Sequence, residues 1–144
     1  MTDERLILIT QRLSKHLTTQ DTAVVSGYLK NISDDAFMTL QSVELKSPVI
    51  GIVLAWFLGA FGGGAFYAKK IGLGITQIIS WSLYLFFTFY SLPEQINNDF
   101  GVRSTFLLVS TIILLGLFFV CLACVGKWVK KYNFQKIMEI LPLL

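Results

Sequence analysis

Three long stretches of the chain contain no charged residue and consist mostly of apolar side chains. They cover residues 47–68, 71–93 and 104–126. A helix rises about 1.5 Å per residue, so roughly 20 residues cross a hydrocarbon core of about 30 Å. Each stretch is long enough to do so, which predicts a membrane domain over residues 47–126. We therefore expect an all-α integral membrane protein with three apolar transmembrane helices.

The three stretches differ in apolar content. Residues 105–126 include fourteen Leu, Ile, Phe or Val side chains, and residues 71–92 include eleven. Each such residue favours insertion by roughly 0.3–0.6 kcal/mol at the helix centre, so both are predicted to span. The first stretch has nine of them together with five Gly residues, and Gly weakens a helix relative to Ala. The first stretch can span, kink or re-enter, and the sequence leaves these outcomes open.

Amphipathic segments flank the membrane domain. Residues 1–46 carry six acidic and five basic residues and form an N-terminal module, and residues 127–144 form a basic C-terminal segment. Apolar side chains recur at helical spacing in both: Leu6, Ile9, Leu13 and Leu17 in the first, and Phe134, Ile137, Met138 and Leu141 in the second. The C-terminal helix can pack on the N-terminal helices or lie in the membrane interface. We favour packing, because its polar face is not dense in Lys or Arg.

Basic clusters next to the apolar stretches predict the topology. Lys69 and Lys70 separate the first two stretches, and a basic and aromatic cluster follows the third: Lys127, Trp128, Lys130, Lys131 and Tyr132. The positive-inside rule makes both clusters cytoplasmic anchors and directs the 93–103 loop outward. The N-terminal module lies outside if residues 47–68 span fully and inside if they re-enter.

Small residues recur at every fourth position of the first stretch, at Gly51, Ala55, Gly59 and Gly63. On one helix they form a strip that lets another helix approach closely. The strip can pack against the second or third stretch of the same chain, which we favour. The alternative is a glycine zipper between chains, which would form a homo-oligomeric channel or pore.

The composition narrows the possible functions. Apolar residues make up 54% of the chain and charged residues 15%, with a mean hydropathy of +0.65, whereas charged residues are about a quarter of a typical soluble domain. This argues against a nucleic-acid binder, a secreted disulfide scaffold and a large catalytic domain. No charged residue lies inside a stretch, although proton and ion pathways usually use one.

No arrangement of residues points to an enzyme. Cys121 and Cys124 form a C-x-x-C pair near the end of an apolar helix, with no second pair nearby, and the single His16 is distant in sequence. We interpret the cysteines as packing residues and His16 as a surface residue. We predict no catalytic residues, no metal site and no cofactor.

The first two stretches resemble the signature of TM-two (two-transmembrane) domain proteins, small membrane proteins of bacteria and animals. The run LKSPVIGIVLAWFLGAFGGGAFYAKKIGLGITQII carries the resemblance, through Lys46 and Pro48, Phe57-Leu58-Gly59, Gly62, Phe66-Tyr67 and Gly72-Leu73-Gly74-Ile75. The segments SDDAFMTLQ and KKYNFQKIMEIL are similar to those that flank the spans of this family. The resemblance covers most of residues 32–141.

The chain also departs from the family pattern. Gly64 and Ala65 stand where the family has Asp-Arg or His-Arg, and Cys121 lies near the place of an acidic residue in its last span. Residues 81–103 exceed the short connection expected there. The resemblance implies a membrane scaffold or regulator and leaves any role of the charged motif in doubt.

We therefore expect a non-enzymatic, multi-pass protein of the bacterial inner membrane. It would act through helix–helix contacts as a partner-binding, regulatory, accessory or immunity subunit. Its expected partners are the lipid bilayer and another membrane protein or a second copy of itself, with no nucleic acid.

Overall fold

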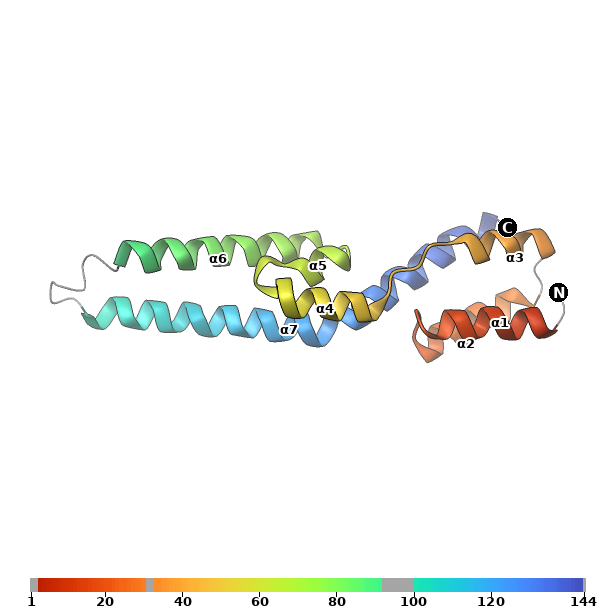
Figure 1. Ribbon diagram of the computed structural model, residues 1–144, viewed down its shortest axis with the longest axis horizontal. Coiled ribbons are helices and arrows are strands. Elements are labelled where there is room, and N and C mark those ends of the chain that lie inside the picture. The colour runs from red at the N-terminus through yellow and green to blue at the C-terminus, as the bar shows by residue number, and fades with distance from the viewer. Residues whose placement is uncertain (1–2, 31–32, 92–99, 144) are drawn as a thin grey trace. The chain divides into compact units, whose positions relative to one another are not determined.

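The structure is a computed structural model that describes residues 3–30, 33–91 and 100–143. All regular structure in these residues is helical, which confirms the predicted all-α class. The α-helices are α1 (Asp3–Ser14), α2 (Thr19–Leu29), α3 (Asp34–Ser42), α4 (Pro48–Leu58), α5 (Gly63–Tyr67), α6 (Ile71–Ser91) and α7 (Phe100–Ile140), and two 3₁₀ turns are η1 (Gly59–Phe61) and η2 (Leu141–Leu143) (Figure 1).

The chain divides into two compact units. The first, called here the terminal unit, combines Met1–Gly51 with Gly126–Leu144. The second, called the apolar unit, is Ile52–Val125. Helix α7 contributes its first part to the apolar unit and its remainder to the terminal unit, so residues 104–126 and the C-terminal segment belong to one helix.

The terminal unit has a hydrophobic core of its own. Its buried side chains come from α1, the turn after it, α2, α3 and α7: Ile9, Leu13, Leu17, Val25, Leu29, Phe37, Leu40 and Ile137. Phe134 and Leu141 pack against this cluster. The C-terminal part of α7 therefore packs on the N-terminal helices, because its apolar stripe completes their core.

Two helices of the chain are long and apolar enough to cross a membrane. The candidate spans are Ile71–Phe89 in α6 and a segment within Leu107–Ile140 of α7. Only 11% and 17% of their most apolar windows are buried inside the protein. The core helix of a soluble protein would be mostly buried, so the exposed apolar surface of these two helices is consistent with a membrane protein.

The first apolar stretch is not one long helix, and a third span is not shown. Helix α4 and the turn η1 give an apolar helical segment that is too short to cross, Pro48–Phe61. Gly62 then adopts a left-handed conformation with φ of 74°, and α5 starts after it. A left-handed residue interrupts a right-handed helix, so residues 47–68 do not form one continuous helix, and the structure shows two candidate spans of the three expected.

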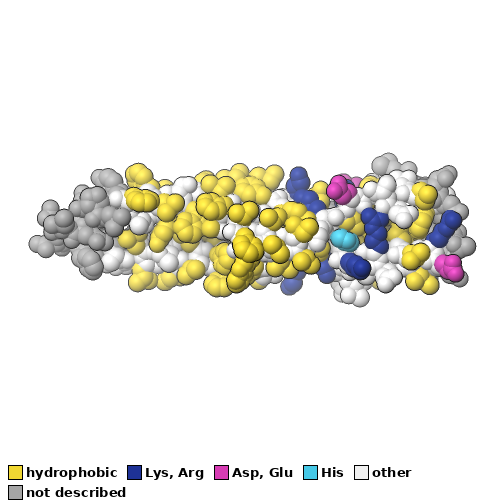
Figure 2. All heavy atoms as spheres, in the orientation of Figure 1, with side chains coloured by type: hydrophobic (Ala, Val, Ile, Leu, Met, Phe, Trp, Pro, Cys, Tyr) yellow, Lys and Arg dark blue, Asp and Glu magenta, His cyan; other side chains and the backbone are white. Residues whose placement is uncertain are grey.

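Helices α6 and α7 lie side by side in the apolar unit (Figure 1). They are antiparallel, because Gln77 near the start of α6 bonds to Leu117 of α7, whereas Tyr84 and Ser110 line one pocket further along. Hydrophobic side chains cover much of the visible face of the apolar unit (Figure 2). The expected outward loop, residues 93–103, lies largely outside the described residues.

Candidate functional site: the glycine-rich hairpin

The glycine-rich segment between α4 and α6 folds as a tight hairpin. Gly62 has to be glycine for two reasons. Its φ of 74° is strained for any residue with a side chain, and a Cβ there would lie 2.8 Å from the Cα and from the carbonyl oxygen of Gly74. The turn therefore rests directly on the backbone of α6.

Helix α5 folds back onto α4 at a second glycine. A Cβ on Gly64 would lie 2.6 Å from the Cβ of Ala55 and 3.0 Å from its Cα. Both Gly64 and Ala55 are buried. The two helices thus meet at backbone contact, which explains why the chain can reverse within so few residues.

The predicted small-residue strip is interrupted by this hairpin. Gly51, Ala55 and Gly59 are buried, whereas Gly63 is half-buried after the break. A Cβ on Gly59 would lie 2.6 Å from the Phe118 ring of α7, and a Cβ on Gly63 would lie 2.6 Å from the Cβ of Leu58. Residues 55, 59 and 63 are therefore in contact with the chain itself.

The hairpin ends in a Schellman cap that carries a lysine. The N–H of Lys70 donates to the carbonyl of Ala65 at 2.8 Å, and the N–H of Lys69 donates to the carbonyl of Phe66 at 3.0 Å. This pattern places Lys69 at the left-handed position, with φ of 60°, where glycine is usual. The Phe66 ring covers Gly74, whose Cβ would lie 2.7 Å from it.

A small polar cluster lies beneath the hairpin. The Nε2 of Gln77 donates a long hydrogen bond of 3.5 Å to the carbonyl of Leu117. Among the described residues, the buried Oε1 of Gln77 has no hydrogen-bond partner, and the Cys121 thiol lies close to the Gln77 side chain and the Ala65 backbone. Cys121 is buried and Cys124 half-buried, and both are free thiols.

The terminal unit contains a second polar cluster, centred on Asn133 of α7. Its side chain is fully buried. The Nδ2 group donates to the carbonyls of Lys46 at 2.8 Å and His16 at 3.1 Å, and Oδ1 accepts from the N–H of Lys46 at 2.9 Å. The Nδ1 atom of His16 lies 3.2 Å from the Lys46 carbonyl, so His16 is part of this cluster.

The predicted anchors differ in exposure. Lys69, Lys70, Lys127 and Lys131 are exposed, whereas Trp128, Lys130 and Tyr132 are half-buried. The Nζ of Lys46 lies 4.8 Å from the centre of the Tyr132 ring, a cation–π contact. Tyr132 is therefore a packing residue of the terminal unit.

Sequence reasoning missed Gly64, Gly74, Phe118 and Asn133 as contact residues. For the two glycines, the signal in the sequence was the number of glycines in this region, which is higher than a spanning helix tolerates. For Asn133 the signal was a poor helix former among apolar positions spaced at i−4 and i+4, Val129 and Ile137.

Within residues 3–30, 33–91 and 100–143, no three His, Cys, Asp or Glu side chains gather closely enough to hold a metal ion.

No family model, curated protein or solved structure matches this chain.

Proposed function

We propose that the protein is an integral membrane protein in which α6 and α7 cross the bilayer and the glycine-rich hairpin re-enters from one side. The exposed apolar side chains of the apolar unit support this proposal. They include Phe57 at 77%, Phe89 at 69% and Leu108 at 60% exposure. Surrounding such a surface with lipid removes it from water, which stabilises the protein by roughly 25 cal/mol for each Å² of apolar surface.

The contacts of the terminal unit support two crossings instead of three. Asn133 bonds to His16 and Lys46, and Ile137 lies in the same core as Ile9. Residues before the first apolar stretch and residues after the last one must therefore lie on the same side. An even number of crossings separates them, which α6 and α7 provide and a third span would not.

The positive-inside rule then gives the orientation. The clusters at Lys69 and Lys127 would both face the cytoplasm, and so would the terminal unit. We propose a bacterial inner-membrane protein with both flanking segments inside and the 93–103 loop outside.

A non-enzymatic, partner-binding or regulatory role suits this arrangement. The bilayer would hold a compact cytoplasmic module, and a groove on that module is available to a partner. The groove is lined by Leu6, Ile7, Thr10, Gln11, Ser14, Ser26 and Lys30. The pore alternative has less support, because Phe118 covers Gly59 and Gly64 covers Ala55, so the strip is occupied within one chain.

Cysteine labelling in intact cells tests the topology. In a background with Cys121→Ala and Cys124→Ala, single cysteines are introduced as Gln20→Cys and Asn97→Cys. We expect an impermeant maleimide to label position 97 in intact cells, and position 20 only after permeabilisation. Labelling of position 20 from outside would mean that the first stretch spans fully, and labelling of position 97 only from inside would reverse the orientation.

Two further measurements test the function. A photo-crosslinking residue at Ile7 should give a discrete adduct with a membrane protein, and Thr10→Trp should abolish that adduct by filling the groove. The same crosslinker at exposed Met38 is the matched control. Reproducible ion flux through liposomes that contain the protein, lost with Gly59→Leu and kept with Gly72→Leu, would instead favour the pore.

A further inference from the structure

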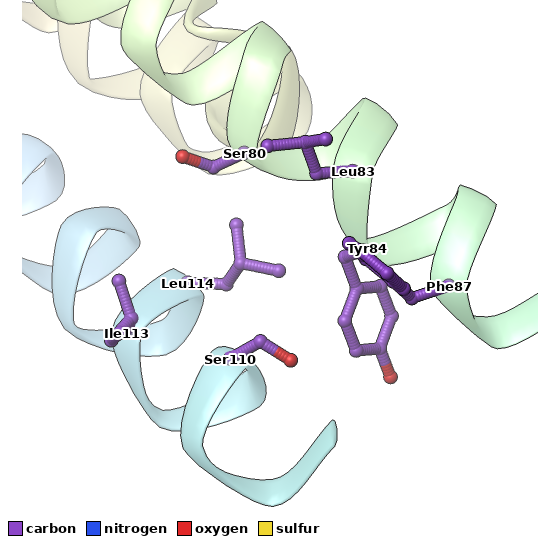
Figure 3. A pocket seen from close by; sticks show the side chains of 7 residues that line it. All are labelled: Ser80, Leu83, Tyr84, Phe87, Ser110, Ile113 and Leu114. Atoms are coloured by element: carbon purple, nitrogen blue, oxygen red, sulfur yellow. The ribbon is translucent and has the colours of Figure 1, made fainter. Parts of the chain in front are cut away.

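A pocket lies between α6 and α7, separate from the hairpin. Its volume is about 170 Å³, and it is lined by Ser80, Leu83, Tyr84, Phe87, Ser110, Ile113 and Leu114. Figure 3 shows the Tyr84 ring and the Leu114 side chain extending from the two helices towards the space between them. An apolar cavity of about 150 Å³ is known to hold one benzene molecule, so this pocket has room for a single ring.

The pocket contains hydroxyl groups that keep hydrogen-bonding capacity. The Ser110 hydroxyl donates to the Leu107 carbonyl at 3.0 Å and is therefore left as an acceptor. Within the described residues, the hydroxyls of Ser80 and Tyr84 have no hydrogen-bond partner. A hydroxyl in hydrocarbon is costly without an acceptor, so an occupant with carbonyl oxygens would be favoured over a plain hydrocarbon chain.

The depth of the pocket limits where those carbonyls come from. This step rests on the proposed membrane crossing of α6. Ser80 is nine residues after Ile71, or about 14 Å along the helix, close to the middle of a core of about 30 Å. Lipid ester groups lie at the interface and do not reach this depth. A carbonyl compound that dissolves in the hydrocarbon does.

We propose that this pocket binds the ring of a lipid-soluble quinone. The ring would pack between Leu114 and the aromatic side chains Tyr84 and Phe87, and its carbonyls would accept hydrogen bonds from Ser80 and Tyr84. Leu83 and Ile113 are half-exposed at its margin, so the ligand enters from the bilayer. Binding alone is proposed, with no electron transfer.

Fluorescence of Trp81 tests the proposal, because its ring centre lies 5.7 Å from that of Tyr84. Trp56→Phe and Trp128→Phe leave Trp81 as the single tryptophan. The protein is reconstituted in phosphatidylcholine liposomes and titrated with duroquinone, whose four methyl groups block addition of thiols. We expect saturable quenching, weakened at least tenfold by Ser80→Leu and unchanged by Ser82→Leu on the exposed side of α6.

Two outcomes would overturn the proposal. The first is quenching that rises without saturation and equally in all three proteins. The second is that durene, which has the same shape without carbonyls, displaces duroquinone at concentrations similar to those at which duroquinone itself binds. Flotation of the proteoliposomes reports membrane insertion separately. Failure of the membrane proposal is therefore distinguishable from failure of quinone binding.

Discussion

The side-chain amide of Asn133 pairs with both backbone polar groups of Lys46, 87 positions earlier in the chain, accepting from its N–H and donating to its carbonyl. The pair fixes residues 43–47, which join α3 to α4 and have no regular secondary structure. Backbone groups outside helices and strands need other hydrogen-bond partners, and the amide of one side chain supplies them here.

Asn133→Ala should lower the free energy of unfolding by about 1–3 kcal/mol, because it removes the partner of the part-buried N–H of Lys46 and of the part-buried carbonyls of Lys46 and His16. Gln135→Ala, at an exposed position of the same helix, is the control and should change it by less than about 0.5 kcal/mol. Thermal unfolding in detergent, followed by circular dichroism, measures both. Equal effects would contradict the structural role of Asn133.

Gly64→Ala should destabilise the hairpin, because the new Cβ meets Ala55 at 2.6 Å and the backbone of α4 cannot move away easily. We expect a loss of about 1–3 kcal/mol. Gly72→Ala, where a Cβ meets nothing within 4 Å, should instead raise stability by about 0.5–1 kcal/mol through helix propensity. If the two variants unfold at the same temperature, the close α4–α5 contact is wrong.

Lys69→Gly should stabilise the protein, since glycine adopts the left-handed conformation at that position without the steric cost that lysine carries. The expected gain is about 0.5–1 kcal/mol in detergent. Lys70→Gly, next to it and without a positive φ, removes the same charge and should give no gain. A gain from both would indicate charge repulsion instead of backbone strain.

Gln77→Met should be tolerated or stabilising by up to about 1 kcal/mol, because it removes a buried oxygen that has no partner among the described residues, and it sacrifices a long hydrogen bond to Leu117 and the contact with Cys121. Gln77→Glu keeps the shape but adds a charge, and should be strongly destabilising. Both variants are heated in detergent, and the temperature at which each loses its monodisperse peak in fluorescence-detected size-exclusion chromatography ranks their stability. A large loss with Gln77→Met would mean that Gln77 has a partner that the structure does not show.

The pattern of apolar residues predicted much of the fold. Two spanning-length helices follow from uncharged runs, and the apolar stripe of α7 from Phe134 to Leu141 contributes to the core of the terminal unit. These features are local, because side-chain polarity at helical spacing decides them. The sequence favours packing of this stripe on α1–α3 but does not decide it, since the membrane interface would also bury an apolar stripe.

The hairpin could not be read from the same pattern. Glycines at positions 51, 59 and 63 fit one helical face, but the 3₁₀ turn Gly59–Phe61 and the left-handed φ of Gly62 break that register. Whether a glycine bends the chain depends on the residues that it contacts in the fold. Gly62 contacts the backbone of Gly74. The contact of Gly59 with Phe118 is likewise non-local, and no spacing rule indicates it.

The core of the terminal unit also has a consequence for biosynthesis. Asn133 and Ile137 lie near the end of α7 and leave the ribosome only after α6 and most of α7, yet α1, α2 and α3 need them to complete their core. In the proposed membrane arrangement, α1, α2 and α3 must therefore wait, incompletely packed, while α6 and α7 enter the bilayer. Chaperone binding or proteolysis of the nascent chain would act during this interval, and the arrival of residues 126–144 would end it.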